Sequence, residues 1–292
     1  MAPTALPDTP TYSHIKMVAS DLDGTLVVGH FGGGKMTQRT VDALQALENK
    51  GIRIIMASGR PPRSMIPIVS QANLKHPLIV GCNGGVVLDS VTKEIIKKYS
   101  LSTEAVRELI KEVKAHFGPD DILIGGESGT NFRCEEAYAQ KRWKWVGQVY
   151  TRVDDLNELA NETHTIEKLM LLHREWDGET LFNYLEKNVL TDPKWKGMIN
   201  YSFSSPYFVE VSAVGVSKAT AIKDIATKFN ITSDEIIAFG DMPNDCEMLQ
   251  FAGIGVAMGN AHQRVKDVAD MITCNNFDDG VAVVLEEVAK QI

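Results

Sequence analysis

The sequence has no apolar run approaching the roughly 18 residues that a membrane-spanning helix needs. Its cationic residues are outnumbered, with 30 lysines and arginines against 38 aspartates and glutamates, and the formal net charge is −8. An excess of negative charge repels the phosphates of nucleic acids and the headgroups of anionic lipids. We therefore expect neither nucleic acid nor a membrane among the partners of this protein.

Cysteine is also scarce, and no two cysteines form a C-x-x-C pair. This spacing argues against a disulfide framework and against a zinc site, and it favours a reduced, cytoplasmic protein. The four cysteines are Cys82, Cys134, Cys246 and Cys274.

The length of 292 residues predicts about two domains, at roughly 150 residues each. Residues 1–14 contain three prolines and no hydrophobic segment, so we expect a flexible N-terminal tail. Residues 15–99 and 212–292 alternate strand and helix patterns, whereas residues 100–211 have longer helices and all four tryptophans. We expect a core domain formed by the two outer segments and an inserted α/β cap domain between them.

Strands alternate with helices at a spacing typical of crossovers in a parallel sheet. Thr37 and Ser217 are each placed to cap a helix, and Gly51 is placed to end the first of these helices. The predicted fold class is α/β, with a Rossmann-like parallel-sheet core and an inserted α+β domain. The strands predicted for the core are 15–20, 52–57, 77–81, 235–239 and 253–258, and those predicted for the insertion are 168–172 and 207–211.

Four polar clusters stand at or just after predicted strand ends, and the carboxyl ends of parallel strands converge on one crevice. The first cluster is Asp21-Leu22-Asp23-Gly24-Thr25. Two carboxylates this close repel each other unless a cation or a shared proton lies between them. The cluster therefore indicates either a metal site with a nucleophilic carboxylate or a general acid–base pair, and a plain turn is the structural alternative.

The second and third clusters offer groups that could bind an anion. Ser58-Gly59-Arg60 provides a hydroxyl and a flexible backbone at a strand end, which could hold a phosphate, although a plain strand-to-helix turn is an equal alternative. Lys218 lies in the first turn of its helix, where the helix dipole slightly disfavours a cation. A buried anionic partner would explain that position, and a solvent-exposed lysine is the alternative.

The fourth cluster runs from Gly240 to Asp245, with Asp241 at the end of an apolar strand. Asn244 and Asp245 could simply cap the following helix. Carboxylate oxygens from two strand ends suit Mg²⁺, which typically takes one or two carboxylates together with waters and substrate phosphate. The cluster therefore favours a magnesium site shared with Asp21.

In this order the clusters resemble the motifs of the haloacid dehalogenase superfamily of phosphohydrolases, in its Cof-like branch with a type IIB cap. The family motif G-D-x-x-N-D-x-x-M-L is matched without a gap from Gly240 to Leu249. The remaining matches are D-x-D-G-T at Asp21 to Thr25, the second motif at Ser58, the Asn-Gly segment at Asn83, the third motif at Lys218, and the segments 257–261 and 275–281. The middle of the chain resembles the cap only by position and length.

The resemblance implies a role for each matched residue. Asp21 would attack phosphorus and form an aspartyl-phosphate, and Asp23 would act as general acid and then as general base. Lys218 would stabilise the charge that develops on the phosphoryl group. The implied ligands of Mg²⁺ are Asp21, the backbone carbonyl of Asp23, Asp241 and Asp245. The implied phosphate and substrate contacts are Ser58, Gly59, Arg60, Asn83 and Asn244.

The activity implied by the resemblance is Mg²⁺-dependent hydrolysis of phosphate monoesters, with small metabolites and above all sugar phosphates as substrates. We expect a small phosphorylated metabolite as partner and a monomer or weak homodimer as oligomeric state. A phosphohexomutase of the same fold and a catalytically idle regulatory or binding protein are the alternatives. The charged groups of Asp21, Asp23, Lys218 and Asp241 argue against the idle protein, because a retired site has no need of them.

Three features are less typical of the branch or allow two interpretations. Residues 29–34 are rich in glycine where relatives usually have a polar stretch, and we expect a surface loop there. Ala219 follows Lys218 where relatives often carry glycine, which leaves the amine in place. Residues 141–145 interleave basic and tryptophan residues. They could meet an anionic or aromatic substrate or a nucleic acid, but packed tryptophans with exposed basic ends are the expected arrangement.

Overall fold

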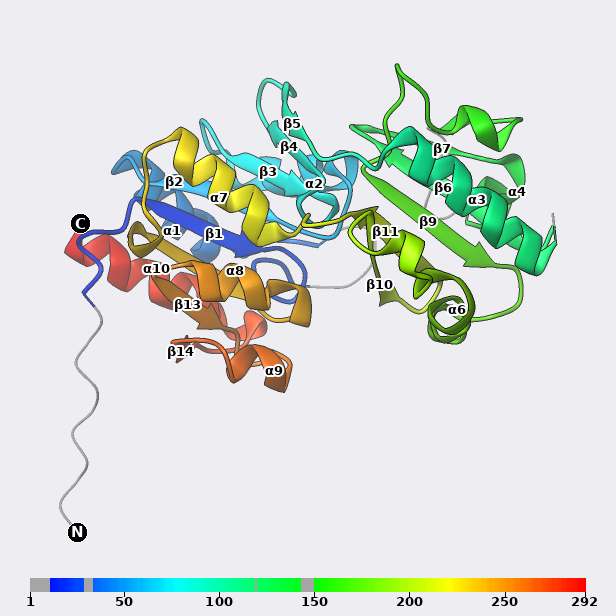
Figure 1. The fold of residues 1–292 in the computed structure, drawn as a ribbon. Coiled ribbons are helices and arrows are strands. Elements are labelled where there is room, and N and C mark those ends of the chain that lie inside the picture. Colours follow the sequence, from blue (N-terminus) through cyan, green and yellow to red (C-terminus); the bar gives the residue numbers. More distant parts are fainter. Residues whose placement is uncertain (1–10, 29–33, 119, 143–149) are drawn as a thin grey trace, which may run out of the picture.

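The computed structural model describes residues 11–28, 34–118, 120–142 and 150–292 (Figure 1). The chain forms two separate β-sheets that lie beside each other, one of eight strands and one of six. Most of the expected N-terminal tail, most of the glycine-rich segment and the two tryptophans of the basic segment lie outside the described residues. No helix in the described ranges combines the length and the apolar character that crossing a membrane requires.

The eight-stranded sheet has the order β14-β13-β12-β1-β2-β3-β4-β5. Neighbouring strands are parallel from β14 to β3, and β4 and β5 add antiparallel pairs at one edge. The connections around β4 are too short for the crossover that parallel strands need. The strands are β1 (Met17–Asp21), β2 (Arg53–Ala57), β3 (Leu78–Gly81), β4 (Val86–Asp89), β5 (Ile95–Lys98), β12 (Ile236–Gly240), β13 (Ile254–Ala257) and β14 (Met271–Ile272).

The helices of this part contact one another in pairs, α1 with α10 and α7 with α8. Both predicted caps are present: Thr37 accepts from the backbone N–H of Thr40 before α1, and Ser217 accepts from that of Thr220 before α7. The helices are α1 (Gln38–Asn49), α2 (Pro62–Val69), α7 (Lys218–Lys228), α8 (Cys246–Phe251), α9 (Gln263–Lys266) and α10 (Gly280–Gln291).

The six-stranded sheet has the order β10-β11-β9-β6-β7-β8 and is antiparallel except for the pair β7 and β8. Its strands are β6 (Ile122–Ser128), β7 (Asn131–Cys134), β8 (Thr151–Arg152), β9 (Lys168–His173), β10 (Ile199–Ser205) and β11 (Phe208–Ala213). The two predicted strands are β9 and β11. Strand β6 lacked a clear apolar pattern because it contains Gly125, where a Cβ would lie 2.5 Å from the ring of Phe132.

Apolar side chains alternate between the two faces of this second sheet. Leu169 and Leu171 of β9 join a cluster with α3 (Thr103–Phe117) and α6 (Gly178–Leu185). Met170 and Leu172 join a smaller cluster with α4 (Glu136–Lys141). Because successive strand residues point to opposite faces, the sheet is covered on both sides. We call the part of the chain from α3 to β11 the inserted unit.

The two sheets have separate hydrophobic cores. The core of the eight-stranded sheet draws on residues 12–88 and 219–288, and that of the inserted unit draws on residues 101–211. The predicted fold class, an α/β core with a largely parallel sheet and an inserted α+β unit, is confirmed. Short helical turns complete the structure at Ser70–Ala72, Cys82–Gly84, Leu156–Glu158, Glu186–Leu190, Pro193–Trp195, Ser233–Glu235, Pro243–Asp245 and Asn276–Asp278.

Candidate active site

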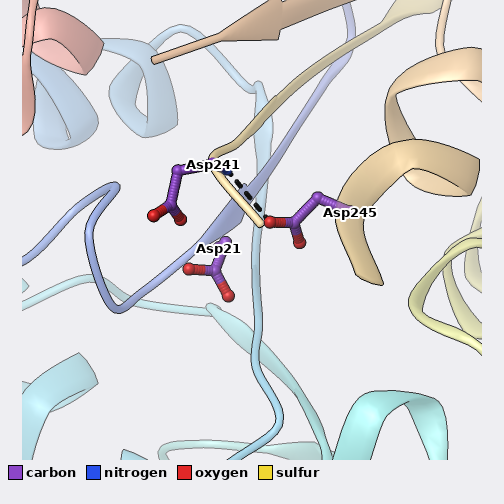
Figure 2. A group of neighbouring side chains, drawn as sticks. All are labelled: Asp21, Asp241 and Asp245. Atoms are coloured by element: carbon purple, nitrogen blue, oxygen red, sulfur yellow. Dashed lines mark hydrogen bonds between the residues drawn. The ribbon is translucent and has the colours of Figure 1, made fainter. Parts of the chain in front are cut away.

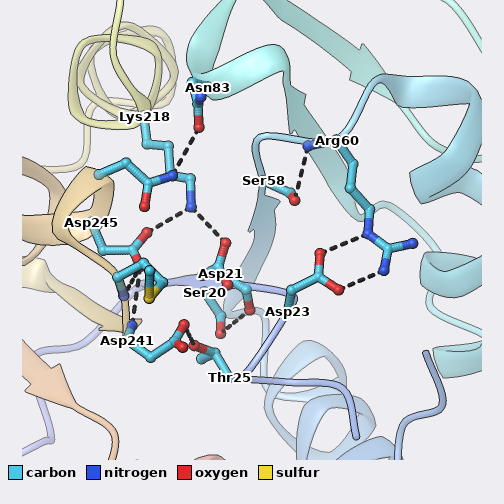
Figure 3. A network of polar contacts seen from close by, with 12 residues as sticks. Ser20, Asp21, Asp23, Thr25, Ser58, Arg60, Asn83, Lys218, Asp241 and Asp245 are labelled. Atoms are coloured by element: carbon cyan, nitrogen blue, oxygen red, sulfur yellow. Dashed lines mark hydrogen bonds and ion pairs between the residues drawn. The ribbon is translucent and has the colours of Figure 1, made fainter. Parts of the chain in front are cut away.

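The polar side chains singled out from the sequence meet at one edge of the eight-stranded sheet (Figure 3). Asp21 is the last residue of β1, Ser58 follows β2, and Asp241 follows β12. These three strands are parallel neighbours, so their carboxyl ends lie at the same edge. Lys218, the first residue of α7, reaches the same place. The fold therefore brings residues from both outer segments of the chain into one site.

Lys218 is a buried lysine, only 1% exposed, between two carboxylates. Its Nζ donates to Oδ1 of Asp21 at 2.5 Å and to Oδ1 of Asp245 at 2.6 Å. Burial lowers the pKa of this lysine, but Asp21 and Asp245 outweigh that effect and raise the pKa above its usual value. The amine is therefore charged and has the buried anionic partners that its position in the helix predicts.

Asp245 holds the turn that follows β12. Its Oδ2 accepts hydrogen bonds from the backbone N–H groups of Asp241 and Met242, each at 3.0 Å. Gly240 makes this possible, because a Cβ there would lie 2.4 Å from the Cβ of Asp245. Asp245 thus fixes Lys218 through one carboxylate oxygen and the backbone of Asp241 through the other.

The carboxylate of Asp241 is held against the loop after β1. Its Oδ1 accepts a hydrogen bond from the hydroxyl of Thr25 at 3.0 Å. Gly24 has a φ of +78°, and a Cβ there would lie 2.3 Å from Oδ2 of Asp241. Burial, followed by the charge of Asp245, raises the pKa of Asp241 to about 6. The glycine of the D-x-D-G-T motif is therefore needed for the approach of Asp241 to the loop.

Asp21, Asp241 and Asp245 form a group of carboxylates whose oxygens lie within 4.8 Å of one another (Figure 2). Burial raises the pKa of Asp21 well above its usual range; Lys218 opposes this shift, and the other two carboxylates add to it. One lysine does not balance three buried carboxylates. Among the described residues, the members of this group are all carboxylates, and a divalent cation that prefers oxygen ligands fits them.

Asp23 lies apart from this group and is paired with Arg60 (Figure 3). The Nε and Nη2 of Arg60 donate to the two carboxylate oxygens of Asp23 at 2.6 and 2.5 Å. The side chain of Asp23 is 37% exposed, whereas that of Asp21 is 8% exposed. Asp23 is therefore much more open to solvent than Asp21.

The residues predicted to contact phosphate lie around Asp21. Ser58 is buried, and its Oγ accepts from the backbone N–H of Arg60 at 3.1 Å. Asn83 adopts a φ of +55°, and its Oδ1 accepts from Nδ2 of Asn244 at 3.0 Å. A Cβ at Gly59 would lie 3.2 Å from that same Asn83 oxygen. The second motif, the Asn-Gly segment and the fourth motif are therefore in mutual contact.

Two asparagines support the loop after β1, and the sequence assigned no role to them. Nδ2 of Asn260 donates to the carbonyl of Gly24 at 2.8 Å, and Oδ1 of Asn260 accepts from the N–H of Asn276 at 2.9 Å. Nδ2 of Asn276 donates to the carbonyl of Val27 at 3.2 Å. The available signal was their place in the segments 257–261 and 275–281, which resemble the branch without showing what they hold.

One more side chain reaches the site from the inserted unit, and nothing in the sequence singled it out. Nζ of Lys168, at the start of β9, donates to the carbonyl of Gly59 at 2.9 Å. The apolar pattern predicted the strand, but a strand pattern does not say which residue at its end will meet another unit of the chain.

Comparisons with known proteins agree with this geometry. The 5-amino-6-(5-phospho-D-ribitylamino)uracil phosphatase YitU of Bacillus subtilis is 30% identical over 277 residues, covering 93% of this chain and 96% of the relative. A solved haloacid dehalogenase-like hydrolase from Bacteroides thetaiotaomicron has a TM-score of 0.78 at 27% identity, with 94% of this chain and 99% of that chain covered. The structure of the subclass IIB sugar phosphatase BT4131 has a TM-score of 0.72 at 25% identity, with 93% and 98% covered.

The family model for haloacid dehalogenase-like hydrolases matches residues 18–285, which span both units of the chain. The motif residues that carry the resemblance also meet in one site. The chain therefore belongs to the haloacid dehalogenase-like hydrolases and is an enzyme of the phosphatase type, as its motifs predict.

Proposed function

We propose that the protein is a Mg²⁺-dependent phosphatase that hydrolyses phosphate monoesters of small metabolites, with sugar phosphates as the substrate class. The observation that carries this proposal is the environment of Asp21. Its carboxylate ends β1, contacts the ammonium of Lys218 and has Asp241 and Asp245 beside it. An anionic phosphate can approach such a carboxylate only where cations offset the repulsion, and the lysine and a metal ion would do so.

The proposed reaction has two steps, and Asp21 is the nucleophile of the first. An oxygen of Asp21 bonds to phosphorus as the ester P–O bond breaks, and Asp23 gives its proton to the departing alkoxide. Asp23 then takes a proton from a water molecule, whose oxygen attacks phosphorus and breaks the bond to Asp21. The products are the free alcohol and inorganic phosphate, and both aspartates return to their starting states.

The other groups hold the phosphoryl group and the metal. Mg²⁺ would be held by Asp21, Asp241, Asp245 and the backbone carbonyl of Asp23, and when bound it supplies positive charge beside the transferring phosphoryl group. Lys218 adds a second, fixed positive charge. Ser58 and Asn244 would donate hydrogen bonds to phosphoryl oxygens, and the bond between Asn83 and Asn244 orients the latter.

Relatives and composition support the proposed substrate and location. One relative is named for a ribitylamino-uracil phosphate and a structural neighbour is a sugar phosphatase, so polyol and sugar phosphates are the first compounds to test. We propose that residues 100–211 form a cap that covers the site and selects the leaving group. All four cysteines are free, which supports a reduced, cytoplasmic setting.

The test is release of inorganic phosphate from a panel of sugar phosphates, polyol phosphates and nucleotides, with Mg²⁺ and with EDTA. We expect release that depends on Mg²⁺ and is lost in Asp21→Asn, whose far-ultraviolet circular dichroism should match the wild type. Release by Asp21→Asn at the wild-type rate would show that Asp21 is not the nucleophile. A phosphohexomutase would instead move the phosphate within the sugar, depend on a bisphosphate activator and release little phosphate.

A further inference from the structure

A buried lysine of the inserted unit contacts the backbone of the catalytic edge. Lys168 is 4% exposed, and its Nζ lies 2.9 Å from the carbonyl oxygen of Gly59 and 2.5 Å from Oε1 of Glu210 on β11. Burial lowers the pKa of Lys168, but Glu210 more than offsets this, so the pKa lies above its usual value. A charged side chain of the six-stranded sheet is therefore hydrogen-bonded to the turn that follows β2 of the eight-stranded sheet.

The three carbonyl groups of the Ser58-Gly59-Arg60 turn are held from two different units. The carbonyl of Ser58 accepts from the N–H of Asn83 at 3.0 Å, and that of Arg60 accepts from the N–H of Cys82 at 2.9 Å. Both donors belong to the segment that follows β3. The carbonyl between them, that of Gly59, accepts from the inserted unit instead. The middle of the turn is thus sensitive to where the inserted unit lies.

This turn carries Arg60, and Arg60 holds Asp23. Both carboxylate oxygens of Asp23 accept hydrogen bonds from Arg60, so the guanidinium sets where this carboxylate lies. In the proposed first step the carboxyl group of Asp23 must lie beside the leaving oxygen, so that step depends on where Arg60 holds it. A displacement of the turn at Gly59 would move the backbone of Arg60, which is the next residue.

Stability alone does not account for the Lys168–Glu210 pair. Replacing a buried ion pair with well-packed apolar residues is often neutral or stabilising. Apolar side chains are well accommodated on the same face of this strand, as Met170 and Leu172 show. A lysine at position 168 is explained by the hydrogen bond that its ammonium donates to the Gly59 carbonyl, because an apolar side chain cannot donate one.

We propose that Lys168 is a positioning residue that links the placement of the inserted unit to the Arg60–Asp23 pair through the carbonyl of Gly59. The link rests on the proposed function, because it acts on the placement of Asp23 beside the leaving group. When the inserted unit moves relative to the eight-stranded sheet, the Gly59 carbonyl gains or loses its donor. The turn then shifts, and Arg60 changes the position of the carboxylate of Asp23.

The test compares Lys168→Met with Lys168→Arg and with a matched control, Lys114→Met. The ammonium of Lys114 also donates to a backbone carbonyl, that of Ile122 at 2.7 Å, and lies 3.4 Å from a glutamate, but these partners are within the inserted unit. We expect Lys168→Met to lower kcat by about tenfold to a hundredfold, as small displacements of catalytic groups do, with little change in KM. Lys168→Arg should recover most of the rate, and Lys114→Met should stay within about twofold of the wild type.

Two further measurements decide whether Lys168 acts through Arg60. In a double-variant cycle with Arg60→Lys, the losses in kcat should be less than multiplicative; fully multiplicative losses would overturn the proposal. Hydrogen exchange at the amides of Cys82 and Asn83 should be faster in Lys168→Met than in Lys114→Met, whatever the activity. If the wild type hydrolyses no phosphate ester, the proposed function fails, and hydrogen exchange still tests the link. If the wild type is active and both methionine variants behave alike in rate and in exchange, only the link fails.

Discussion

Buried charges are arranged differently around the two sheets. At the edge of the eight-stranded sheet, Lys218 is the counter-charge for a group of three buried carboxylates, Asp21, Asp241 and Asp245. Around the six-stranded sheet, each buried glutamate among the described residues has donors of its own. Glu210 pairs with Lys168, and Glu127 accepts two hydrogen bonds from Arg63 of α2.

The most deeply buried glutamate of the inserted unit follows the same rule. Glu167 is fully buried, and its oxygens accept from the hydroxyls of Ser100 and Thr165 at 2.8 and 2.6 Å and from the N–H of Gly129 at 2.5 Å. Buried carboxylates are costly unless they are paired or fully hydrogen-bonded. The balanced glutamates therefore serve to place the two units, whereas the unbalanced aspartates leave room for a cation and a substrate.

The largest effect is expected from removing the positive charge of Lys218, which offsets the three buried carboxylates at the edge of the eight-stranded sheet. Lys218→Met removes the ammonium and leaves two buried carboxylates without it, so kcat should fall about a hundredfold or more. The free energy of unfolding should fall by about 3–5 kcal/mol without metal, because a buried pair is broken on one side. Steady-state kinetics and urea unfolding in EDTA and in Mg²⁺ measure both effects. A variant that keeps the wild-type kcat would exclude Lys218 from the chemistry.

A second change disturbs the proposed metal site without substituting any of its ligand residues. Gly24→Ala places a Cβ 2.3 Å from the present position of Oδ2 of Asp241, so that carboxylate must move. We expect the Mg²⁺ concentration for half-maximal activity to rise about tenfold or more, as for other changes that misplace metal ligands. Gly51→Ala is the matched control, because Gly51 also has a positive φ but nothing lies within 4 Å of the place where its Cβ would stand. An equal rise in both variants would assign the effect to backbone strain.

The imbalance also predicts how stability depends on pH when metal is absent. Asp241 has a pKa of about 6 in the folded protein, against 3.8 ordinarily, and the pKa of Asp21 is shifted in the same direction. Between about pH 4 and 6 the folded state keeps protons that the unfolded state has lost, so these groups lower the free energy of unfolding as pH rises. Above that window the full cost of the ionised Asp241 is present unless a cation offsets it.

Thermal unfolding from pH 4 to pH 7, in EDTA and in Mg²⁺, checks this expectation. Other carboxyl groups titrate in both series, so the difference between the two curves isolates the site. We expect the stabilisation by Mg²⁺ to grow as pH rises through 6. Curves that stay parallel over the whole range would mean that the raised pKa values do not belong to the metal site.

The two sheets also differ in how much of their structure could be predicted from the sequence. Asp21 and Asp241 could be placed together because strand ends of a parallel sheet meet at one edge, and the positions of strand ends follow from the apolar pattern. Lys218 follows β11 of the six-stranded sheet, so that argument does not place it at the site. The Arg60–Asp23 pair was not predicted, although both residues were singled out. Side-chain direction at a strand end depends on the turn that follows, which here is fixed by Cys82 and Asn83.

The inserted unit was less predictable for a physical reason. Its contacts with the core, such as Lys168 with Gly59 and Arg63 with Glu127, join residues more than 60 positions apart on elements that no crossover rule relates. Strand β6 was missed because Gly125 interrupts its apolar pattern to make room for Phe132. Strands β9 and β11, by contrast, were predicted, because their apolar runs are local features of the sequence.

The smallest effect is expected from removing a balanced pair as a whole. Arg63→Met alone leaves Glu127, which is 2% exposed, without its cation, and should cost about 3–5 kcal/mol of unfolding free energy. The double variant Arg63→Met with Glu127→Leu removes both charges and should lie within about 1 kcal/mol of the wild type, because an apolar replacement of a buried pair is often neutral. Urea unfolding of the two variants measures this difference. If the double variant is as unstable as the single one, the Glu127 pair contributes more than charge balance, and the proposed division between balanced and unbalanced burial fails.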